Sequence, residues 1–344
     1  MSCIAVACRI TENAPSVILN ASKYWGKTGR TYFHLRKTTL LLLVALLSAS
    51  GCGFRSSHPV KMLTSTATLK EATLDQLVES INTNSEKLKT LKATVDIDSS
   101  VLEEKKNRVK DNPQVSGLIL VRKPEMLRMR IYVPVLHNVM ADMVSNGKSF
   151  ELASPIKSKF YVGSNQQMGK PSPQPLENLR PQHISDALLL KPIEAGKEIA
   201  VLENTTEIVK DPKTHKDVQQ LAYTLVVIDK DGAGYYLSRR IVFSRTDLLP
   251  HEQSIYNRQG QLVTFSRYEN LSEYSGIMLP AIVSIQRPIE GYGITISMVK
   301  VDVNAPLTDE QFVLTQPAGS QVINLDTKSS ASAAPEVESK KPPR

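Results

Sequence analysis

The chain has 344 residues, of which 42 are basic and 34 acidic, for a formal net charge of +8 at pH 7. Six of the 42 basic and one of the 34 acidic residues lie in residues 1–51, so the rest carries 36 basic and 33 acidic residues and a net charge of about +3. This near balance, and the lack of a basic stripe interleaved with aromatic residues, argue against nucleic-acid binding.

An export signal is predicted from the order of residues before Cys52. Basic residues precede the apolar run Leu40–Leu47, and the small residues Ser48–Gly51 follow it. This order is typical of a signal peptide, and the apolar stretch is shorter than the roughly 20 residues that a membrane-spanning helix needs. We therefore assign residues 1–51 to a signal peptide with an atypically long N-terminal region.

Cys52 is predicted to carry a lipid anchor. The segment Ala49-Ser50-Gly51-Cys52 resembles the bacterial lipobox, in which the cysteine is lipidated and becomes the mature N-terminus. Its two or more acyl chains would hold the protein stably at a membrane. Ordinary secretory cleavage or a chance cysteine is the alternative. The other cysteines, Cys3 and Cys8, precede the cut, so the mature domain has no thiol for a disulfide or a metal.

After a linker within residues 52–64, one helix and a first set of strands are predicted. Six apolar residues recur at three- and four-residue spacing, which indicates an amphipathic helix, or two short ones joined near Asn82–Asn84. These residues are Leu74, Leu77, Val78, Ile81, Leu88 and Leu91. From Lys92 the period changes to two, as in strands. The predicted strands are Ala93–Glu103, Val115–Arg122, Met126–Val133, Val139–Val144, Ser149–Ala153 and Lys159–Val162.

The second half of the chain begins with a proline-rich stretch, Gln166–Gln182, which predicts an extended loop, and continues with a short helix at His183–Leu190. Hairpin turns are expected at Asp229–Gly232 and Asn257–Gly260. The predicted strands are Glu198–Ile208, Leu221–Ile228, Tyr235–Phe243, His251–Tyr256, Gln261–Tyr268, Ile282–Gln286 and Gly293–Val303. Residues 326–344 have a composition that cannot bury a core, which predicts a disordered tail.

Residues 65–325 are therefore expected to form one mainly β (α+β) domain. Many short strands joined by hairpin turns indicate a barrel or a strongly curved antiparallel sheet. One helix precedes the strands and one is inserted midway.

Three stretches, in this order, resemble the bacterial lipoprotein-localisation factors of the LolA/LolB-like superfamily. In Gly117–Arg128 a strand ends at a basic residue followed by proline, and the next strand opens with a hydrophobic-Arg pair. Asp142–Phe150 is similar to the family's hairpin with an Asn-Gly turn. Asn304–Leu307 and Phe312–Gly319 are similar to its closing segment. The most similar members are expected among uncharacterised envelope lipoproteins.

The resemblance implies a half-open antiparallel β-barrel with an N-terminal helix and an inserted helical lid. Its concave apolar face would bind acyl chains of lipids or lipoproteins. The residues expected to line this face are Leu127, Met129, Ile131, Val133, Met140, Ile184 and Leu188. Methionine suits such a cavity because its side chain adapts to disordered chains. The alternative is that all seven residues are simply core.

Leu136 is a candidate for contact with the membrane or with cargo. It lies in Tyr132–Asn138, a turn between two predicted strands with apolar residues at its tip. In outer-membrane acceptors of the superfamily, an exposed leucine on a corresponding loop helps to receive the lipoprotein. An ordinary buried turn leucine is the alternative.

No catalytic or cofactor-binding pattern is evident, so we expect a protein that is not an enzyme. The mature histidines are scattered without metal-ligand spacing, and there is no Gly-x-Ser-x-Gly elbow or phosphate-binding glycine loop. Asp96 and Asp98 share one face of a strand, where such a pair is usually solvated. No cofactor and no metal are expected.

The sequence leads to two hypotheses. The first is a lipid-anchored envelope protein that binds acyl chains of membrane lipids or lipoproteins, with a role in lipoprotein localisation and a periplasmic carrier or envelope complex as partner. Gly53, rather than Asp, follows Cys52, which favours the outer membrane over the inner membrane under the best-known sorting rule. The second is a non-carrier scaffold of an envelope assembly. An apolar pocket of about 300 Å³ or more would favour the first, and a filled interior the second.

Overall fold

The computed structural model describes residues 64–103, 108–136, 138–165, 180–211, 213–232 and 234–326. They belong to the second of two compact units into which the chain divides, Met62–Arg344. Cys52, the predicted signal peptide, most of the linker, nearly all of the proline-rich loop and residues 327–344 of the predicted tail lie outside the described residues.

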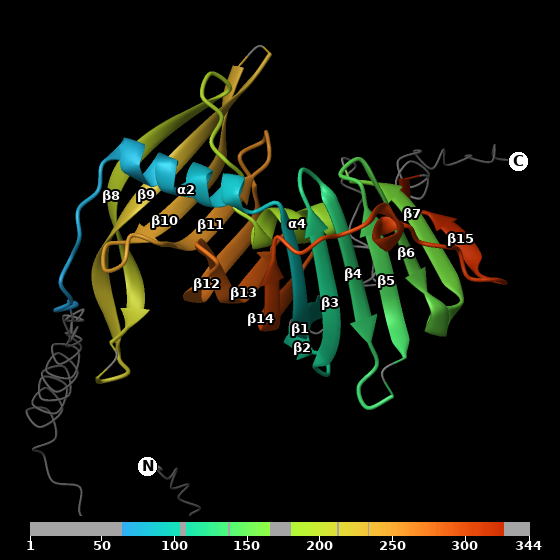
Figure 1. Cartoon of the computed structure of the whole chain (residues 1–344). Helices are drawn as coiled ribbons and strands as arrows, with labels where there is room; N and C mark the ends of the chain where they lie inside the picture. Colours follow the sequence, from blue (N-terminus) through green and yellow to red (C-terminus); the bar gives the residue numbers. More distant parts are fainter. Residues whose placement is uncertain are drawn as a thin grey trace, which may run out of the picture. The chain divides into compact units, whose positions relative to one another are not determined.

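The described residues form one open sheet of fifteen strands with two α-helices packed against it (Figure 1). The helices are α2 (Leu74–Lys87) and α4 (Pro181–Leu188), and two short 3-10 helices are η2 (Pro155–Lys157) and η3 (Asp309–Phe312). The strands are β1 (Thr90–Glu103), β2 (Arg108–Asp111), β3 (Val115–Arg122), β4 (Met126–Tyr132), β5 (Val139–Ser145), β6 (Ser149–Ser154), β7 (Lys159–Ser164), β8 (Glu198–Lys210), β9 (Asp217–Asp231), β10 (Gly234–Ser244), β11 (Pro250–Tyr256), β12 (Leu262–Tyr274), β13 (Ile277–Arg287), β14 (Tyr292–Val303) and β15 (Gln321–Asn324).

The sheet consists of two antiparallel meanders joined at β1. One meander runs from β3 to β7 and the other from β8 to β14, and β1 pairs with β3 on one side and with β14 on the other. The short β2 pairs with β1 beyond the end of β3, and β15 pairs with β7 in parallel, unlike the other pairs. The prediction of a mainly β fold with an antiparallel open sheet, an N-terminal helix and an inserted helix is confirmed.

Both predicted hairpin turns are present. The turn between β9 and β10 contains Gly232 with a φ of 46°, and the turn between β11 and β12 contains Gly260 with a φ of 75°. Glycine suits both positions because it has no Cβ to clash in the left-handed region. These turns fix the register of the strands that form the second meander.

Helix α2 is shorter than its apolar pattern suggested. Its start follows from a capping box, in which the Gln76 amide donates to Thr73 Oγ1 at 3.3 Å and the Thr73 amide to Gln76 Oε1 at 2.9 Å. At the other end, the Asn304 side chain donates to the Lys87 carbonyl at 2.9 Å and accepts from the Lys89 amide at 2.7 Å. The helix therefore ends at Lys87, and the prediction that Leu88 and Leu91 are helical is wrong.

Two asparagines fasten α2 to the rest of the domain, and the helix runs through them without a break. The Asn82 side chain donates to the Ile193 carbonyl at 3.1 Å and accepts from the Ile193 amide at 2.8 Å. In the same way, Asn84 bonds to both backbone groups of Met278, at 2.9 and 2.7 Å. Each asparagine side chain thus bonds to both the N–H and the C=O of one residue, Ile193 for Asn82 and Met278 for Asn84.

Helix α4 is buried between the two meanders. It contacts β4 and β5 of one and β12 and β13 of the other. Its residues Ile184, Ala187 and Leu188 are at most 3% exposed and join a core cluster that draws on strands of both meanders. Pro181 opens the helix two residues earlier than predicted, at a position where its missing N–H costs nothing. The inserted helix thus fills the interior of the curved sheet.

The removal of one asparagine contact should loosen α2. We expect Asn84→Ala to lower the free energy of unfolding by about 1–3 kcal/mol, because the N–H and C=O of Met278 lose their partner. Asn204→Ala, at an exposed position of β8, serves as the control and should change it by less than about 0.5 kcal/mol. Urea unfolding followed by circular dichroism measures both. Equal effects of the two substitutions would contradict the role given to Asn84.

Candidate functional site

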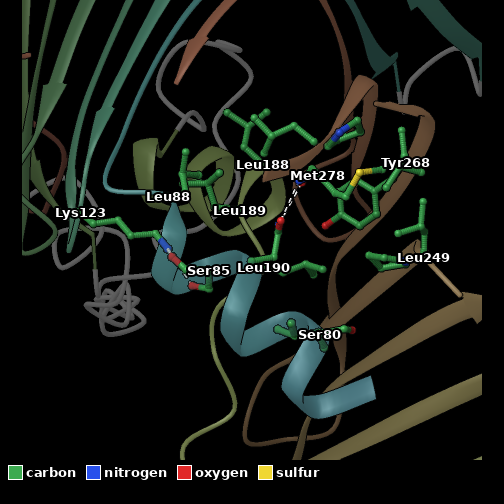
Figure 2. A pocket seen from close by; sticks show the side chains of 16 residues that line it. Ser80, Ser85, Leu88, Lys123, Leu188, Leu189, Leu190, Leu249, Tyr268 and Met278 are labelled. Carbon is green, nitrogen blue, oxygen red and sulfur yellow. Dashed lines mark hydrogen bonds between the residues drawn. The ribbon is translucent and has the colours of Figure 1, made fainter. Parts of the chain in front are cut away.

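An apolar pocket of about 140 Å³ lies between α2, the segment that follows α4, and the hairpin of β12 and β13. Figure 2 shows its side chains converging from these elements, with Lys123 at one end and Leu249 at the other. Leucines and other apolar side chains form most of its wall, among them Ile81, Leu88, Leu189, Leu190, Leu271 and Met278. Such a lining favours hydrocarbon over water.

The polar groups beneath the pocket are satisfied by the protein itself. The Tyr268 hydroxyl donates to the Ala187 carbonyl at 2.8 Å, and the Gln253 side chain donates to the Asp186 carbonyl at 3.0 Å. These carbonyls belong to the last turn of α4, where a helix leaves acceptors free. Burial raises the pKa of Tyr268, so the phenol stays neutral. The carbonyls of Asp186 and Ala187 therefore need no polar ligand at this point.

Lys123 is the charged residue of the pocket wall. It precedes Pro124 in the turn between β3 and β4, and its Nζ donates to the carbonyl oxygen of Ser85 and, at 2.7 Å, to Ser85 Oγ. Burial and, secondly, the positive charge of Lys89 lower the pKa of Lys123. The sequence resemblance included this basic-Pro pair, but nothing in the strand pattern indicated that the pairing of β3 with β1 brings the lysine beside the end of α2.

The size of the pocket limits what it holds. At about 140 Å³ it is close to an engineered cavity of about 150 Å³ that binds benzene. It is smaller than the volume of about 300 Å³ that was set above as favouring acyl-chain binding over a scaffold. In this conformation it accommodates a short stretch of one acyl chain.

The residues predicted to line a cavity lie mostly in the core next to the pocket. Of the seven, Leu188 lines the pocket. Leu127, Met129, Ile131 and Ile184 are between 1% and 8% exposed within the core cluster around α4. Met140 packs partly buried against the same cluster, and Val133 is half-buried. Four of the seven are thus buried in the core, and Leu188 belongs both to that core and to the pocket wall.

Leu136 is exposed at the tip of the turn between β4 and β5. Its side chain is 69% exposed, and that of Val135, which has a φ of 69°, is 90% exposed. The alternative of a buried turn leucine is therefore wrong. Leu102 and Val109, on the hairpin of β1 and β2, are also exposed. β1, β3 and β4 are successive antiparallel neighbours. The hairpin of β1 and β2 and the Leu136 turn therefore lie at the same end of these strands.

A cluster of charged and hydroxyl groups lies elsewhere, around His251. The imidazole lies 3.0 Å from Asp247 and 3.5 Å from Glu207, and Gln220 bonds to both Glu207 and the fully buried Ser244. Burial alone would lower the pKa of His251, but its hydrogen bonds to the two carboxylates raise it to about 9. A histidine that is protonated at neutral pH cannot take a proton from a serine, so the cluster is suited to fixing strands together, not to nucleophilic catalysis.

Because of this cluster, we expect the free energy of unfolding to fall at alkaline pH. A raised pKa contributes stability that is fully present below the unfolded value of about 6.5 and is lost as the pH rises through about 9. The shift corresponds to no more than about 3 kcal/mol. We expect the unfolding free energy of the wild type to fall between pH 7 and pH 10, and that of His251→Gln to fall less. A variant curve parallel to the wild-type curve in urea titrations would contradict the assignment.

Within the described ranges, no group of three or more His, Cys, Asp or Glu side chains is arranged to hold a metal ion. In that same part of the chain, neither α-helix is long and apolar enough to cross a bilayer.

No protein-family model matches the chain, and no curated protein matches it. Solved structures with a similar course of the chain exist. A LolA superfamily protein from Nitrosomonas europaea is 16% identical, with a TM-score of 0.44, over 71% of this chain and 99% of that one. An outer membrane lipoprotein-sorting protein domain from Vibrio parahaemolyticus, described as putative, is 12% identical, with a TM-score of 0.43, over 69% of this chain and 94% of that one. A DUF1329 family protein from Desulfovibrio piger is 13% identical, with a TM-score of 0.47, over 71% of this chain and 98% of that one.

The first of these proteins carries the name of the superfamily that the sequence resembles. At such identities the likeness concerns the arrangement of the strands and helices. It assigns no ligand, partner or location to this chain.

Proposed function

We propose that this protein is a lipid-anchored envelope protein that binds one acyl chain in the pocket between α2 and the hairpin of β12 and β13, without chemical turnover. The observation that carries the proposal is an apolar pocket whose underlying polar groups are already paired. Each methylene that enters such a pocket contributes about 0.8 kcal/mol. The ligands in view are membrane lipids or the acyl chains of a lipoprotein.

A longer chain needs a shift of α2. The helix covers the pocket, and its contact with β13 depends on the two hydrogen bonds of Asn84 to Met278. Hydrogen bonds of this kind contribute about 1 kcal/mol each, so their exchange for buried hydrocarbon is energetically feasible. Opening at this contact would extend the pocket along α2.

The position of the first described residues supports a tether. Thr64 forms a bridge with Gln219 at the start of β9, and the Ser65 amide donates to the Gln219 carbonyl at 2.9 Å. Twelve residues, Gly53–Thr64, connect this point to Cys52. Fully extended, they span at most about 40 Å. A lipidated Cys52 would thus hold the domain close to the membrane surface, which we propose is the periplasmic face of the outer membrane.

The second candidate function is a scaffold of an envelope assembly, and the filled interior around α4 favours it. The long edge strand β8 would serve such a role. It has no partner along its outer side among the described residues, and it presents Ile199, Val201 and Ile208, each between 47% and 60% exposed. An unpaired edge of this kind accepts a strand of another chain. A periplasmic carrier or another envelope protein is the partner class in view.

Filling the pocket should abolish acyl binding. We expect Leu271→Trp to weaken the binding of a fluorescent fatty alcohol about tenfold or more, because the larger ring occupies the space of the chain. Val299→Trp, at a 65% exposed position of β14, is the matched control. Fluorescence titration of Cys52→Ser protein without detergent measures the affinity. Unchanged binding by Leu271→Trp would mean that the fatty alcohol binds elsewhere, and it would contradict acyl binding in this pocket.

We expect the exposed Leu136 to contribute to contact with a membrane or cargo and not to the stability of the fold. We expect Leu136→Glu to leave the unfolding free energy within about 0.5 kcal/mol of the wild type and to reduce transfer of an acylated peptide to liposomes. Ile156→Glu, at a 63% exposed position of η2, is the control. Transfer is measured by co-flotation of the labelled peptide. If both substitutions reduced transfer equally, Leu136 would have no specific role.

A further inference from the structure

Lys123 has no acidic partner in the pocket that it lines. No carboxylate lies within 4.0 Å of its Nζ in the part of the chain that the structure describes, and the charge that acts on its pKa is that of another cation, Lys89. Cations withdrawn from water normally have an anion beside them, because the loss of hydration is otherwise uncompensated. A half-buried ammonium among leucines is therefore poised for an anion from outside the chain.

The Lys123 ammonium and the Ser85 hydroxyl each have a hydrogen-bond donor that these contacts do not use. A lysine ammonium has three N–H donors, and two of them are directed to the carbonyl and hydroxyl oxygens of Ser85. The third remains for a ligand. Ser85 Oγ accepts one of these bonds, so its own hydrogen is also available to an acceptor. Two donors thus stand side by side at one end of an apolar pocket (Figure 2).

The end of α2 contributes to the charge around Lys123. Ser85 belongs to the last turn of the helix, whose carbonyls carry partial negative charge. Lys123 neutralises this end, Lys87 and Lys89 add positive charge around it, and the exposed Glu86 adds one negative charge. An acidic side chain would face the helix end unfavourably unless it reached the ammonium directly. A ligand that enters through the pocket does reach it.

We propose that the pocket selects amphiphiles with one acyl chain and an anionic oxygen head, such as a carboxylate or a phosphate monoester. Lys123 and Ser85 bind the head, and the chain lies against Leu271, Met278 and their neighbours. This inference rests on the proposed function and adds to it the class of head group. The volume of about 140 Å³ agrees with one chain and not with several.

Photo-crosslinking of the full chain reconstituted in liposomes tests the inference. Three probes carry the same diazirine-bearing hexadecyl chain and differ in the head: a carboxylate, a phosphate monoester and an uncharged alcohol. Mass spectrometry measures the amount of probe attached to the pocket peptides of β12 and β13. Probe that only partitions into the bilayer is therefore not counted. We expect at least one anionic probe to label these peptides about tenfold more than the alcohol. The preferred anionic head identifies the source of the ligand.

Three substitutions sharpen the result. Lys123→Met should reduce labelling by the anionic probes to the level of the alcohol and leave alcohol labelling unchanged, and Lys123→Arg should retain the preference. Lys92→Met, at an exposed position of β1 outside the pocket wall, is the matched control. If Lys123→Met fails to fold by circular dichroism, the comparison of heads in the wild type and in Ser85→Ala still decides the question.

Two outcomes would overturn the inference, and they differ. Equal labelling of the pocket by all three probes, unaffected by Lys123→Met, would remove the selection for an anionic head and leave acyl binding intact. No labelling of the pocket by any probe would remove the proposed function as well.

Discussion

The antiparallel pairing of β1 with β14 joins the two meanders into one sheet and sets the position of everything packed on its inner face. The pairing runs from Leu91 with Val303 to Val101 with Tyr292. Since α2 ends two residues before β1 begins, the end of the helix is held where β14 ends. Asn304, directly after β14, bonds to the backbone of Lys87, Lys89 and Thr90 and makes this junction rigid. The helix can therefore lie only over the second meander, where the pocket forms.

The interior is divided between a filled part and an open part. Around α4, apolar side chains from strands of both meanders are almost fully buried in one core cluster. Under α2, Leu77 and Ile81 are at most 4% exposed in a second core cluster with side chains of β9 and β10, and polar contacts of Asn82, Asn84 and Lys123 add to this packing. Polar contacts exchange with water at little net cost, whereas interlocked apolar side chains do not. Of the contacts that hold α2, those of Asn82, Asn84 and Ser85 are therefore the ones that water can replace.

Most of the fold could be predicted because its determinants are local. Alternation in Met126–Tyr132 and glycine turns such as the one at Gly260 act within a few residues. Leu91 was misassigned because helix and strand patterns overlap at a junction, and a side chain more than 200 residues away decides where the helix ends. The pocket could not be predicted for the same reason, because its walls meet only through the pairing order of the sheet. Ile184 and Leu188 lie on one face of α4 and are both core residues, and the helical pattern does not show that only Leu188 also lines the pocket.

The central claim is that the domain binds an acyl chain, and native mass spectrometry of the protein extracted from a bacterial envelope tests it most directly. Release and identification of bound lipid in organic solvent complete the measurement. The account predicts close to one single-chain acyl amphiphile for each protein chain, beyond the mass of any anchor on Cys52. A mass without added lipid, unchanged after incubation with fatty acids, phospholipids and lipopeptides, would contradict it and leave the anchored scaffold as the function.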